Sequence, residues 1–248
     1  MKGLIVGLAN DQSLAWGCAR ALRDQGAALA LTYLGDKARP HVEPLARAVE
    51  APIFLPLDVT RPEQVDTLFD TIEREWGSLD FLLHSIAFAP KADLHGRVLD
   101  CSAQGFAIAM DVSCHSLIRL AARAAPLMKQ GGSILTLSFY GSEKVITGYG
   151  IMGPVKAALE ASVRYLAADL GPSGVRVNAL STGPVRTRAA SGLSHFDDLM
   201  VKAVETAPLH QLVTIEQVGD MAAFLLSSRA PTITGQTIYI DAGYNITA

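Results

Sequence analysis

The residues best suited to chemistry are Tyr149 and Lys156, in the segment Tyr-Gly-Ile-Met-Gly-Pro-Val-Lys. This spacing is close to two helical turns, so it predicts that both side chains leave one face of a helix. An ammonium near a phenol favours the phenolate, so we expect Lys156 to lower the pKa of Tyr149 and make it a good proton donor. The same pair also occurs by chance on ordinary amphipathic helices, so the rest of the chain must decide between the two interpretations.

Composition restricts the class of protein. The chain has 248 residues, 50% of them hydrophobic, which suits one α/β domain with a large buried core. The net charge of −3 argues against nucleic-acid binding, because it leaves no strong basic patch. Cys18, Cys101 and Cys114 lack metal-ligand spacing and are expected to be free thiols in a reducing cytosol. No unbroken apolar run reaches the ~18 residues of a membrane span, so we expect a cytoplasmic protein with neither membrane nor metal.

Apolar strands alternate with helical segments along the whole chain. This order predicts an α/β fold, a Rossmann-like doubly wound parallel sheet of seven strands in a single domain over residues 1–248. Strands are expected at residues 4–6, 28–33, 53–57, 81–85, 133–138, 175–180 and 237–240. Helices are expected near residues 13–25, 41–48, 62–76, 104–128 and 149–170. Ligands bind such sheets at the carboxyl ends of the strands, where Gly7, Asp58, Ser85, Ser138 and Ser181 all fall.

The first strand leads into a helix through the pattern Gly7-x5-Ser13-x-Ala15-x-Gly17. Small residues there let the backbone approach a pyrophosphate, whose charge is favoured by the free N–H groups of a helix N-terminus. Ser13 would then cap the helix or donate to a phosphate oxygen. An ordinary glycine turn followed by a helix cap explains the spacing equally well.

The ends of the second and third strands bear on the choice of nucleotide. Enzymes that require NAD usually carry a carboxylate after strand two, but Tyr33 and Leu34 stand there. Lys37 and Arg39 follow; they either meet a 2′-phosphate or are solvated helix charges. After strand three, Asp58 would accept from an adenine amino group with Val59 beside the ring, or would cap the helix that begins at residue 62.

Four groups of residues together resemble the short-chain dehydrogenase/reductase superfamily. They resemble most its divergent branch, the enoyl-[acyl-carrier-protein] reductases of bacterial fatty-acid synthesis. The groups are the glycine pattern at Gly7, the run His-Ser-Ile-Ala-Phe-Ala-Pro at 84–90, the pair Tyr149-x6-Lys156, and Gly-Pro-Val-Arg-Thr at 183–187 followed by Ala-Ala-Ser-Gly at 189–192. Carbonyl-reducing members carry Asn-Asn-Ala-Gly after strand four and a Tyr-x3-Lys pair instead.

The resemblance implies an oxidoreductase in which NAD(P)H delivers hydride to the β-carbon of a trans-2-enoyl thioester. Tyr149 would donate to the thioester oxygen as enolate charge develops, and Lys156 would hold the ribose hydroxyls of the nicotinamide half. NADH is the expected cofactor, with NADPH left open. The implied partner is an acyl-carrier protein that carries the enoyl group.

The resemblance also implies the composition of the site. Its cofactor residues are Gly7, Ser13, Leu14, Asp58, Val59, Ser85, Ile86, Ala87, Leu137, Lys156, Pro184, Val185 and Thr187. Its substrate pocket is formed by Phe88, Phe139, Tyr149, Met152, Ala189 and Ala190, beneath a mobile flap at about residues 188–204. A homotetramer is implied, with the alanine-rich helices 104–128 and 149–170 packed across two-fold interfaces; the same alanines would equally suit packing onto their own sheet.

Some residues depart from the family pattern. Phe139 stands where many members have a second tyrosine, so we expect Phe139 to pack against nicotinamide or substrate and Tyr140 to lie outside the site. Gly148 and Gly150 flank Tyr149, and their backbone freedom is expected to loosen its placement. Pro154 is expected in the first turn of its helix, where the missing N–H is tolerated.

Other polar residues invite roles that ordinary structure explains better. His84, His95, His115 and His195 do not form a metal-ligand set and are expected to be structural. Asp111 and His115, four residues apart, are expected to form a helix-surface pair. Three functions remain open: an enoyl-thioester reductase, which is favoured, a related oxidoreductase acting on a ketone or another activated alkene, and a dinucleotide-binding regulator without turnover.

Overall fold

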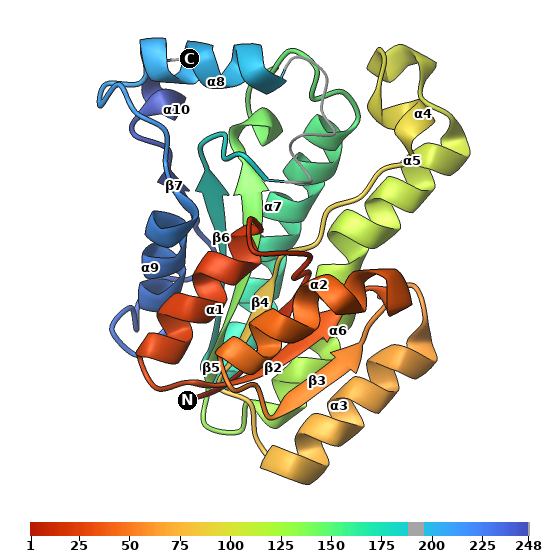
Figure 1. The fold of residues 1–248 in the computed structure, drawn as a ribbon, viewed down its shortest axis with the longest axis vertical. Coiled ribbons are helices and arrows are strands. Elements are labelled where there is room, and N and C mark those ends of the chain that lie inside the picture. The colour runs from red at the N-terminus through yellow and green to blue at the C-terminus, as the bar shows by residue number, and fades with distance from the viewer. Residues whose placement is uncertain (188–195, 248) are drawn as a thin grey trace.

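The computed structural model of the chain describes residues 1–187 and 196–247. Its centre is a seven-stranded sheet with the order β3-β2-β1-β4-β5-β6-β7, in which all neighbouring strands are parallel (Figure 1). The strands are β1 (Lys2–Val6), β2 (Ala28–Tyr33), β3 (Ile53–Pro56), β4 (Phe81–His84), β5 (Gly132–Phe139), β6 (Val175–Thr182) and β7 (Thr237–Ile240). The order reverses between β1 and β4, which is where such sheets bind ligands. The predicted fold class is confirmed.

Helices cover both faces of the sheet. They are α1 (Leu14–Asp24), α2 (Gly35–Ala48), α3 (Pro62–Trp76), α4 (Lys91–Leu94), α5 (Ala103–Met110), α6 (Ser116–Ala124), α7 (Met152–Leu170), α8 (Phe196–Thr206), α9 (Ile215–Leu226) and α10 (Tyr244–Thr247). A π-helical segment, η2 (Asp111–His115), joins α5 to α6, and short 3₁₀ turns are η1 (Val98–Asp100), η3 (Ala125–Leu127), η4 (Tyr140–Ser142) and η5 (Gly171–Ser173). Figure 1 shows α4, α8 and α10 beyond the carboxyl ends of the central strands.

The alternation of apolar side chains along each strand produces two hydrophobic cores. Leu4 and Val6 of β1 face the core formed with α3, α6 and α7. Ile5, between them, faces the opposite core, formed with α1, α2 and α9. Because both faces are covered, the strands are apolar throughout, as parallel sheets require.

Several elements differ from the sequence expectation. α2 begins at Gly35 rather than near residue 41, and α7 begins at Met152 rather than at 149. Pro154 lies in the first turn of α7, as predicted. Helix α9 was not predicted, although Thr214 and Gln217 form a reciprocal capping box at its start. The expected helix at 104–128 is divided by the π-helical segment η2.

Residues Ala103–Leu127 form one continuous helical stretch. Its 25 residues contain an 18-residue window with a mean hydropathy of 1.2, which makes it long and apolar enough to cross a membrane by length and composition alone. Polar and charged side chains interrupt it, so no unbroken apolar run marks it in the sequence. Its apolar window is 44% buried inside the fold, and core helices of globular proteins pass the same test.

Gly17, the last member of the first glycine pattern, is explained by helix packing. A Cβ on Gly17 would overlap the carbonyl oxygen of Ile215 on α9, and a Cβ on Gly219 would overlap the carbonyl oxygen of Gly17. The two glycines therefore allow the backbones of α1 and α9 to touch. This contact fixes the helix that follows β1 against the face of the sheet.

We expect Gly17→Ala to lower the free energy of unfolding by about 1–3 kcal/mol, because the methyl group forces α1 away from α9. Urea unfolding followed by circular dichroism measures the change. Asp220→Ala, on the exposed side of α9, is the matched control and should be nearly neutral. A Gly17→Ala protein as stable as the control would show that the two backbones are not in contact.

Candidate active site

Tyr149 lies in a loop before α7, not on the helix. Gly148 and Gly150 on either side have φ of +80° and +49°, in the left-handed region that side chains other than glycine rarely adopt. The Tyr149 N–H donates to the Ile146 carbonyl oxygen at 3.1 Å, and the Met152 N–H donates to the Tyr149 carbonyl oxygen at 3.1 Å. The prediction that Tyr149 and Lys156 share a helix face is therefore wrong. The glycines shape a hydrogen-bonded turn around Tyr149 rather than loosening it.

The ring of Tyr149 is packed between aromatic and small residues. Its centroid lies 4.9 Å from that of Phe139 in an edge-on contact. A Cβ on Gly141 would overlap the Tyr149 ring, so the space for the ring depends on that glycine. Met152 belongs to the same buried cluster. Three of the predicted pocket residues are thus brought together.

The environment of Tyr149 does not make its phenol more acidic. Burial raises the pKa of Tyr149 above its ordinary value, and the negative charge of Glu160 raises it further. The expectation that Lys156 would lower this pKa is wrong, because loss of solvent outweighs any attraction from the ammonium. Tyr149 is accordingly held as a neutral phenol.

Lys156 is buried on α7 and directed at strand β5. Its Nζ donates to the carbonyl oxygen of Leu137 at 2.7 Å. Burial lowers the pKa of Lys156 to about 8, and attraction to Glu160 opposes that change. The ammonium remains mostly charged near pH 7.

The end of β1 meets the end of β4. A Cβ on Gly7, whose φ is +93°, would overlap the carbonyl oxygen of Ser85. The Ser85 N–H donates to the carbonyl oxygen of Val6 at 3.0 Å. Two of the predicted cofactor residues, Gly7 and Ser85, are thereby in contact at the reversal point of the sheet.

Helix α1 presents an N-terminus that its own side chains do not satisfy. Ser13 is the N-cap residue, but its Oγ donates backwards to the carbonyl oxygen of Asn10 at 2.6 Å. No acidic residue stands in the first turn, which begins at Leu14. The capping role proposed for the Ser13 side chain is therefore wrong; the Trp16 N–H of the first turn donates to the Ser13 carbonyl oxygen at 2.9 Å.

Asp58 and Val59 follow β3. An Asp58 oxygen accepts from the N–H and the hydroxyl of Thr60, at 2.9 and 2.7 Å. The N-cap of α3 is Arg61, so the alternative that Asp58 caps this helix is wrong. Val59 is buried in the core, and its carbonyl oxygen accepts from Arg119 at 2.5 Å.

The segment after β4 is held by Ser113, which sequence reasoning missed. The Ser113 Oγ accepts from the Phe88 N–H at 2.8 Å and donates to the Phe88 carbonyl oxygen at 2.9 Å. Ile86 is half-buried and Ala87 is exposed. The ring of Phe88 is 52% exposed and lies outside the cluster around Tyr149, so this predicted pocket residue is not brought to the others. The sequence offered little signal, because Ser113 is one of several polar residues at 111–116.

The predicted residues after β6 are described only in part. Pro184 is buried, and Val185 and Thr187 are half-buried. Ala189, Ala190 and His195 lie outside the described residues, as does the predicted flap from 188 to 195. The remainder of that flap, from 196, is the start of helix α8, which packs Phe196 and Met200 inward.

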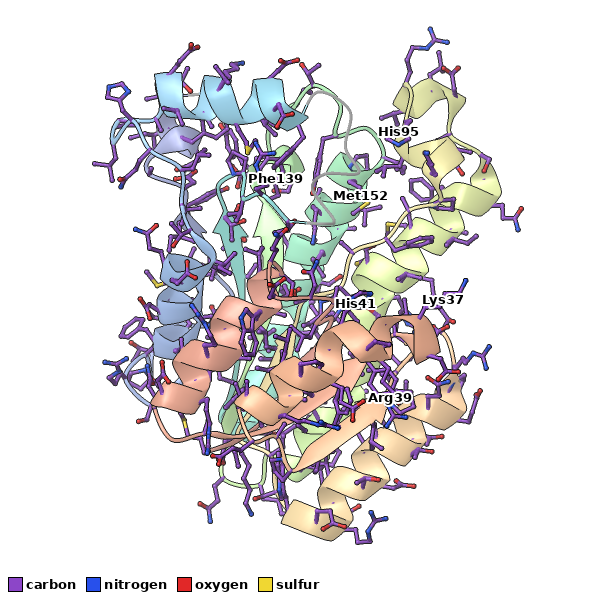
Figure 2. All side chains as sticks on the ribbon, in the orientation of Figure 1. Lys37, Arg39, His41, His95, Phe139 and Met152 are labelled. Atoms are coloured by element: carbon purple, nitrogen blue, oxygen red, sulfur yellow. The ribbon has the colours of Figure 1, made fainter. Side chains whose placement is uncertain are left out.

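The predicted substrate pocket and the basic residues after β2 lie in separate parts of the structure. Figure 2 shows Phe139 and Met152 near the carboxyl ends of the strands, whereas Lys37 and Arg39 lie on α2. Arg39 pairs with Glu43 at 3.2 Å, whereas Lys37 is exposed to solvent. The basic residues of α2 thus stand at some distance from the tyrosine.

Tyr140 points away from Tyr149. It is buried in a cluster with residues of α8 and α10, where its ring makes edge-on contacts with Tyr239 and Tyr244. This agrees with the expectation that Tyr140 lies outside the site.

His84 is a structural histidine, as predicted. Its Nδ1 and Nε2 lie 2.8 Å from the hydroxyls of Thr136 and Ser116, one on each side. Burial lowers the pKa of His84 to about 3, with a further contribution from the charge of Lys156. The ring is neutral and joins β4 to β5 and α6.

Of the exposed histidines, His115 fits its prediction as a surface pair, but His95 is not the structural histidine that was expected. His95 is exposed at the end of α4. His115 lies 3.4 Å from Asp111, which also pairs with Arg119 at 2.7 Å, so the predicted surface pair is confirmed. Cys18 and Cys114 are buried free thiols, while Cys101 is only half-buried.

Comparisons with known proteins cover almost the whole chain. The family model described as enoyl-(acyl carrier protein) reductase matches residues 7–245. Enoyl-[acyl-carrier-protein] reductase [NADH] 1 of Rhizobium meliloti is 48% identical over 98% of this chain and 90% of its own length.

Solved structures give the same picture. The enoyl-(acyl-carrier-protein) reductase of Anaplasma phagocytophilum, solved in complex with NAD, matches with a TM-score of 0.96 and 48% identity, covering 100% of this chain and 94% of that one. The Bacillus cereus enoyl-acyl carrier protein reductase, solved with NADP+ and indole naphthyridinone, matches with a TM-score of 0.97 and 44% identity, covering 100% and 97%.

The neutral state of His84 makes stability depend on pH. Its pKa is about 3 in the fold and near 6.5 when unfolded, so unfolding takes up a proton below pH 6.5. The contribution of neutral His84 to the free energy of unfolding is complete above pH 6.5. It falls by about 2 kcal/mol as the pH drops from 6.5 to about 5. His84→Gln should lack this component, which urea unfolding at several pH values measures. The control His41→Gln, at an exposed position, should keep the wild-type pH dependence. If the free energy of unfolding depends on pH equally in all three proteins, His84 is not the group responsible.

Proposed function

The chain belongs to the enoyl-(acyl carrier protein) reductase family, and we propose that it reduces trans-2-enoyl-[acyl-carrier-protein] thioesters to acyl thioesters with NADH, in bacterial fatty-acid synthesis. The observation that carries this proposal is the buried cluster of Phe139, Tyr149 and Met152 at the carboxyl ends of the strands, with Lys156 close to Leu137. The family favours this function over the ketone reductase and the non-catalytic regulator that the sequence left open.

Features of the chain itself fit a dinucleotide. Gly7 allows the backbones after β1 and β4 to approach each other, and the N-terminus of α1, which has no side-chain cap, would receive a pyrophosphate. Ser13, Leu14, Ser85, Ile86 and Ala87 would line this end. Other residues proposed to contact the nucleotide are Asp58, Val59, Leu137, Pro184, Val185 and Thr187. The Asp58 oxygens remain partly accessible for an adenine amino group.

NADH is the cofactor proposed for this chain, because the Rhizobium meliloti relative is named as an NADH enzyme. Arg39 is already paired with Glu43, which reduces its availability for a 2′-phosphate. Lys37 is the residue that would meet the phosphate of NADPH.

When bound, NADH supplies the hydride that adds to the β-carbon of the enoyl thioester. Tyr149 stabilises the charge that then develops on the thioester oxygen, by donating a hydrogen bond or its proton. A raised pKa suits this role, because the phenol keeps its proton until the oxygen becomes basic. Phe139, in edge contact with Tyr149, restricts the ring to one orientation.

Lys156 contributes positive charge and hydrogen-bond donors beside the tyrosine. With a pKa of about 8 it is charged near pH 7, which suits a contact to ribose hydroxyls. Its Nζ has three protons, and only one is used by the Leu137 carbonyl oxygen in the structure.

The acyl chain would lie beside Met152 and Phe139, with Ala189 and Ala190 completing the pocket. We assign residues 188–204, including the first turns of α8, to a flap that excludes water. Acyl-carrier protein is the partner that would present the chain. A cytoplasmic location and one domain over residues 1–248 follow from the same proposal.

A homotetramer is supported by an apolar groove on the surface between α6 and α7. The groove has a volume of about 250 Å³ and is lined by Ile118, Ala161, Ser162, Tyr165, Leu166 and Asp169. Tyr165 is 74% exposed and Ile118 is 37% exposed, which is unusual for such side chains at a surface without a partner. We assign this face to contact with a second copy of the chain.

Tyr149→Phe should lower kcat by on the order of 10²–10⁴ while changing NADH affinity little, because it removes a donor used in the transition state. Steady-state kinetics with an enoyl thioester and fluorescence titration with NADH measure the two quantities. Tyr140→Phe, one residue after Phe139 but in a different cluster, is the control and should keep kcat within a few-fold. Undiminished turnover in Tyr149→Phe would refute the role of the phenol.

Ile118→Arg should break the proposed tetramer, because a charge would be buried in an apolar contact. Light scattering after gel filtration should report a smaller species than the wild type. Leu99→Arg, 81% exposed on η1, is the control and should leave the mass unchanged. A wild-type monomer would overturn the assignment of this face.

A further inference from the structure

Glu160 is a buried carboxylate that the proposed mechanism does not use. It lies on α7 one turn after Lys156, and it is 4% exposed. The Ser138 hydroxyl donates to its Oε1. The four-residue spacing directs Glu160 and Lys156 to the same face of the helix.

The two side chains are fixed by adjacent residues of β5. Lys156 donates to the Leu137 carbonyl oxygen, and Glu160 accepts from Ser138, the next residue along the strand. One strand end thereby positions both charges. If Glu160 served only to hold Ser138, the buried cation Lys156 one turn earlier on α7 would have no reason to accompany it.

Burying a charge without a counter-charge is strongly unfavourable. Among the described residues, Lys156, Glu160 and Asp241 are the lysine, arginine, aspartate and glutamate side chains that are less than a tenth exposed. Asp241 is occupied by the N–H groups of Gly243 and Asn245, at 2.9 and 2.8 Å. Within this part of the chain, Glu160 is the buried anion left to balance Lys156.

We propose that Glu160 is a positioning residue for Lys156: its carboxylate, held by Ser138, keeps the Lys156 ammonium charged and directed at the cofactor. This inference rests on the proposed function, since it gives Lys156 a contact with NADH. Loss of the carboxylate would let the ammonium release its proton at a lower pH.

The other groups around Lys156 contribute less than Glu160 to keeping the ammonium charged. His84 on β4 is neutral, because burial lowers its pKa to about 3. Cys114 on η2, whose Sγ lies 3.5 Å from the Ser162 hydroxyl, also raises the pKa of Lys156, but less than Glu160 does. Tyr149, in the loop before α7, is a neutral phenol whose pKa Glu160 raises.

The test is the pH dependence of NADH binding, measured by fluorescence titration without turnover. In the wild type, affinity should fall as the pH rises through about 8, where Lys156 loses its proton. Glu160→Gln keeps the shape of the side chain and removes its charge, so the fall should begin about one pH unit lower or more. Glu160→Asp should restore part of the wild-type profile.

Two control variants remove an ionisable group other than Glu160. Cys114→Ala should move the profile less than Glu160→Gln does, because Cys114 affects the pKa of Lys156 less than Glu160. Asp220→Asn removes an exposed carboxylate on α9 and should change neither profile nor affinity. Identical profiles for Glu160→Gln and the wild type would overturn the inference, whereas a wild type that does not bind NADH would overturn the proposed function.

A double-mutant cycle keeps the inference testable if Glu160→Gln folds poorly. Glu160→Gln should destabilise the wild type, because it leaves Lys156 without a counter-charge. In a Lys156→Met background, the same change should be neutral or stabilising, because it removes the remaining buried charge. Equal destabilisation in both backgrounds, measured by urea unfolding, would show that Glu160 does not act through Lys156.

Discussion

The burial of one ammonium group, that of Lys156, is the constraint on which the site depends. A cation removed from water must find a counter-charge and hydrogen-bond acceptors within the fold. Leu137 and Ser138 at the end of β5, with Glu160 on α7, meet this requirement through two hydrogen bonds between strand and helix. The bonds hold α7 against β5, and the loop that carries Tyr149 leads directly into that helix.

Space for the site comes from glycines whose substitution would bring atoms into overlap. Gly141 leaves room for the Tyr149 ring, and Gly7 lets the segments after β1 and β4 meet. Gly148 and Gly150 adopt left-handed conformations that turn the chain into α7. These positions are determined by steric exclusion rather than by attraction, so a single methyl group at any of them would move a functional element.

Periodicity predicted the sheet, several of its helices and the placement of Gly7 and Ser85 at strand ends, because these depend on local patterns of apolar and small residues. The start of α7 was predicted too early, at Tyr149 instead of Met152, because the seven-residue spacing to Lys156 was taken as helical although Gly148 and Gly150 form a turn. The pKa of Tyr149 was predicted in the wrong direction, because desolvation depends on burial that spacing does not reveal. Glu160 and Ser113 were missed because their partners on β5 and after β4 are distant in sequence.

The most direct measurement is the nicotinamide absorbance of NADH mixed with the wild-type protein and a trans-2-octenoyl thioester of acyl-carrier protein. A parallel reaction contains the corresponding 3-oxoacyl thioester. We predict rapid oxidation of NADH with the enoyl substrate and none with the ketone, because the chain belongs to the enoyl-(acyl carrier protein) reductase family. Binding of NADH without oxidation by the enoyl thioester, or oxidation by the ketone alone, would contradict the role proposed for Tyr149 and Lys156.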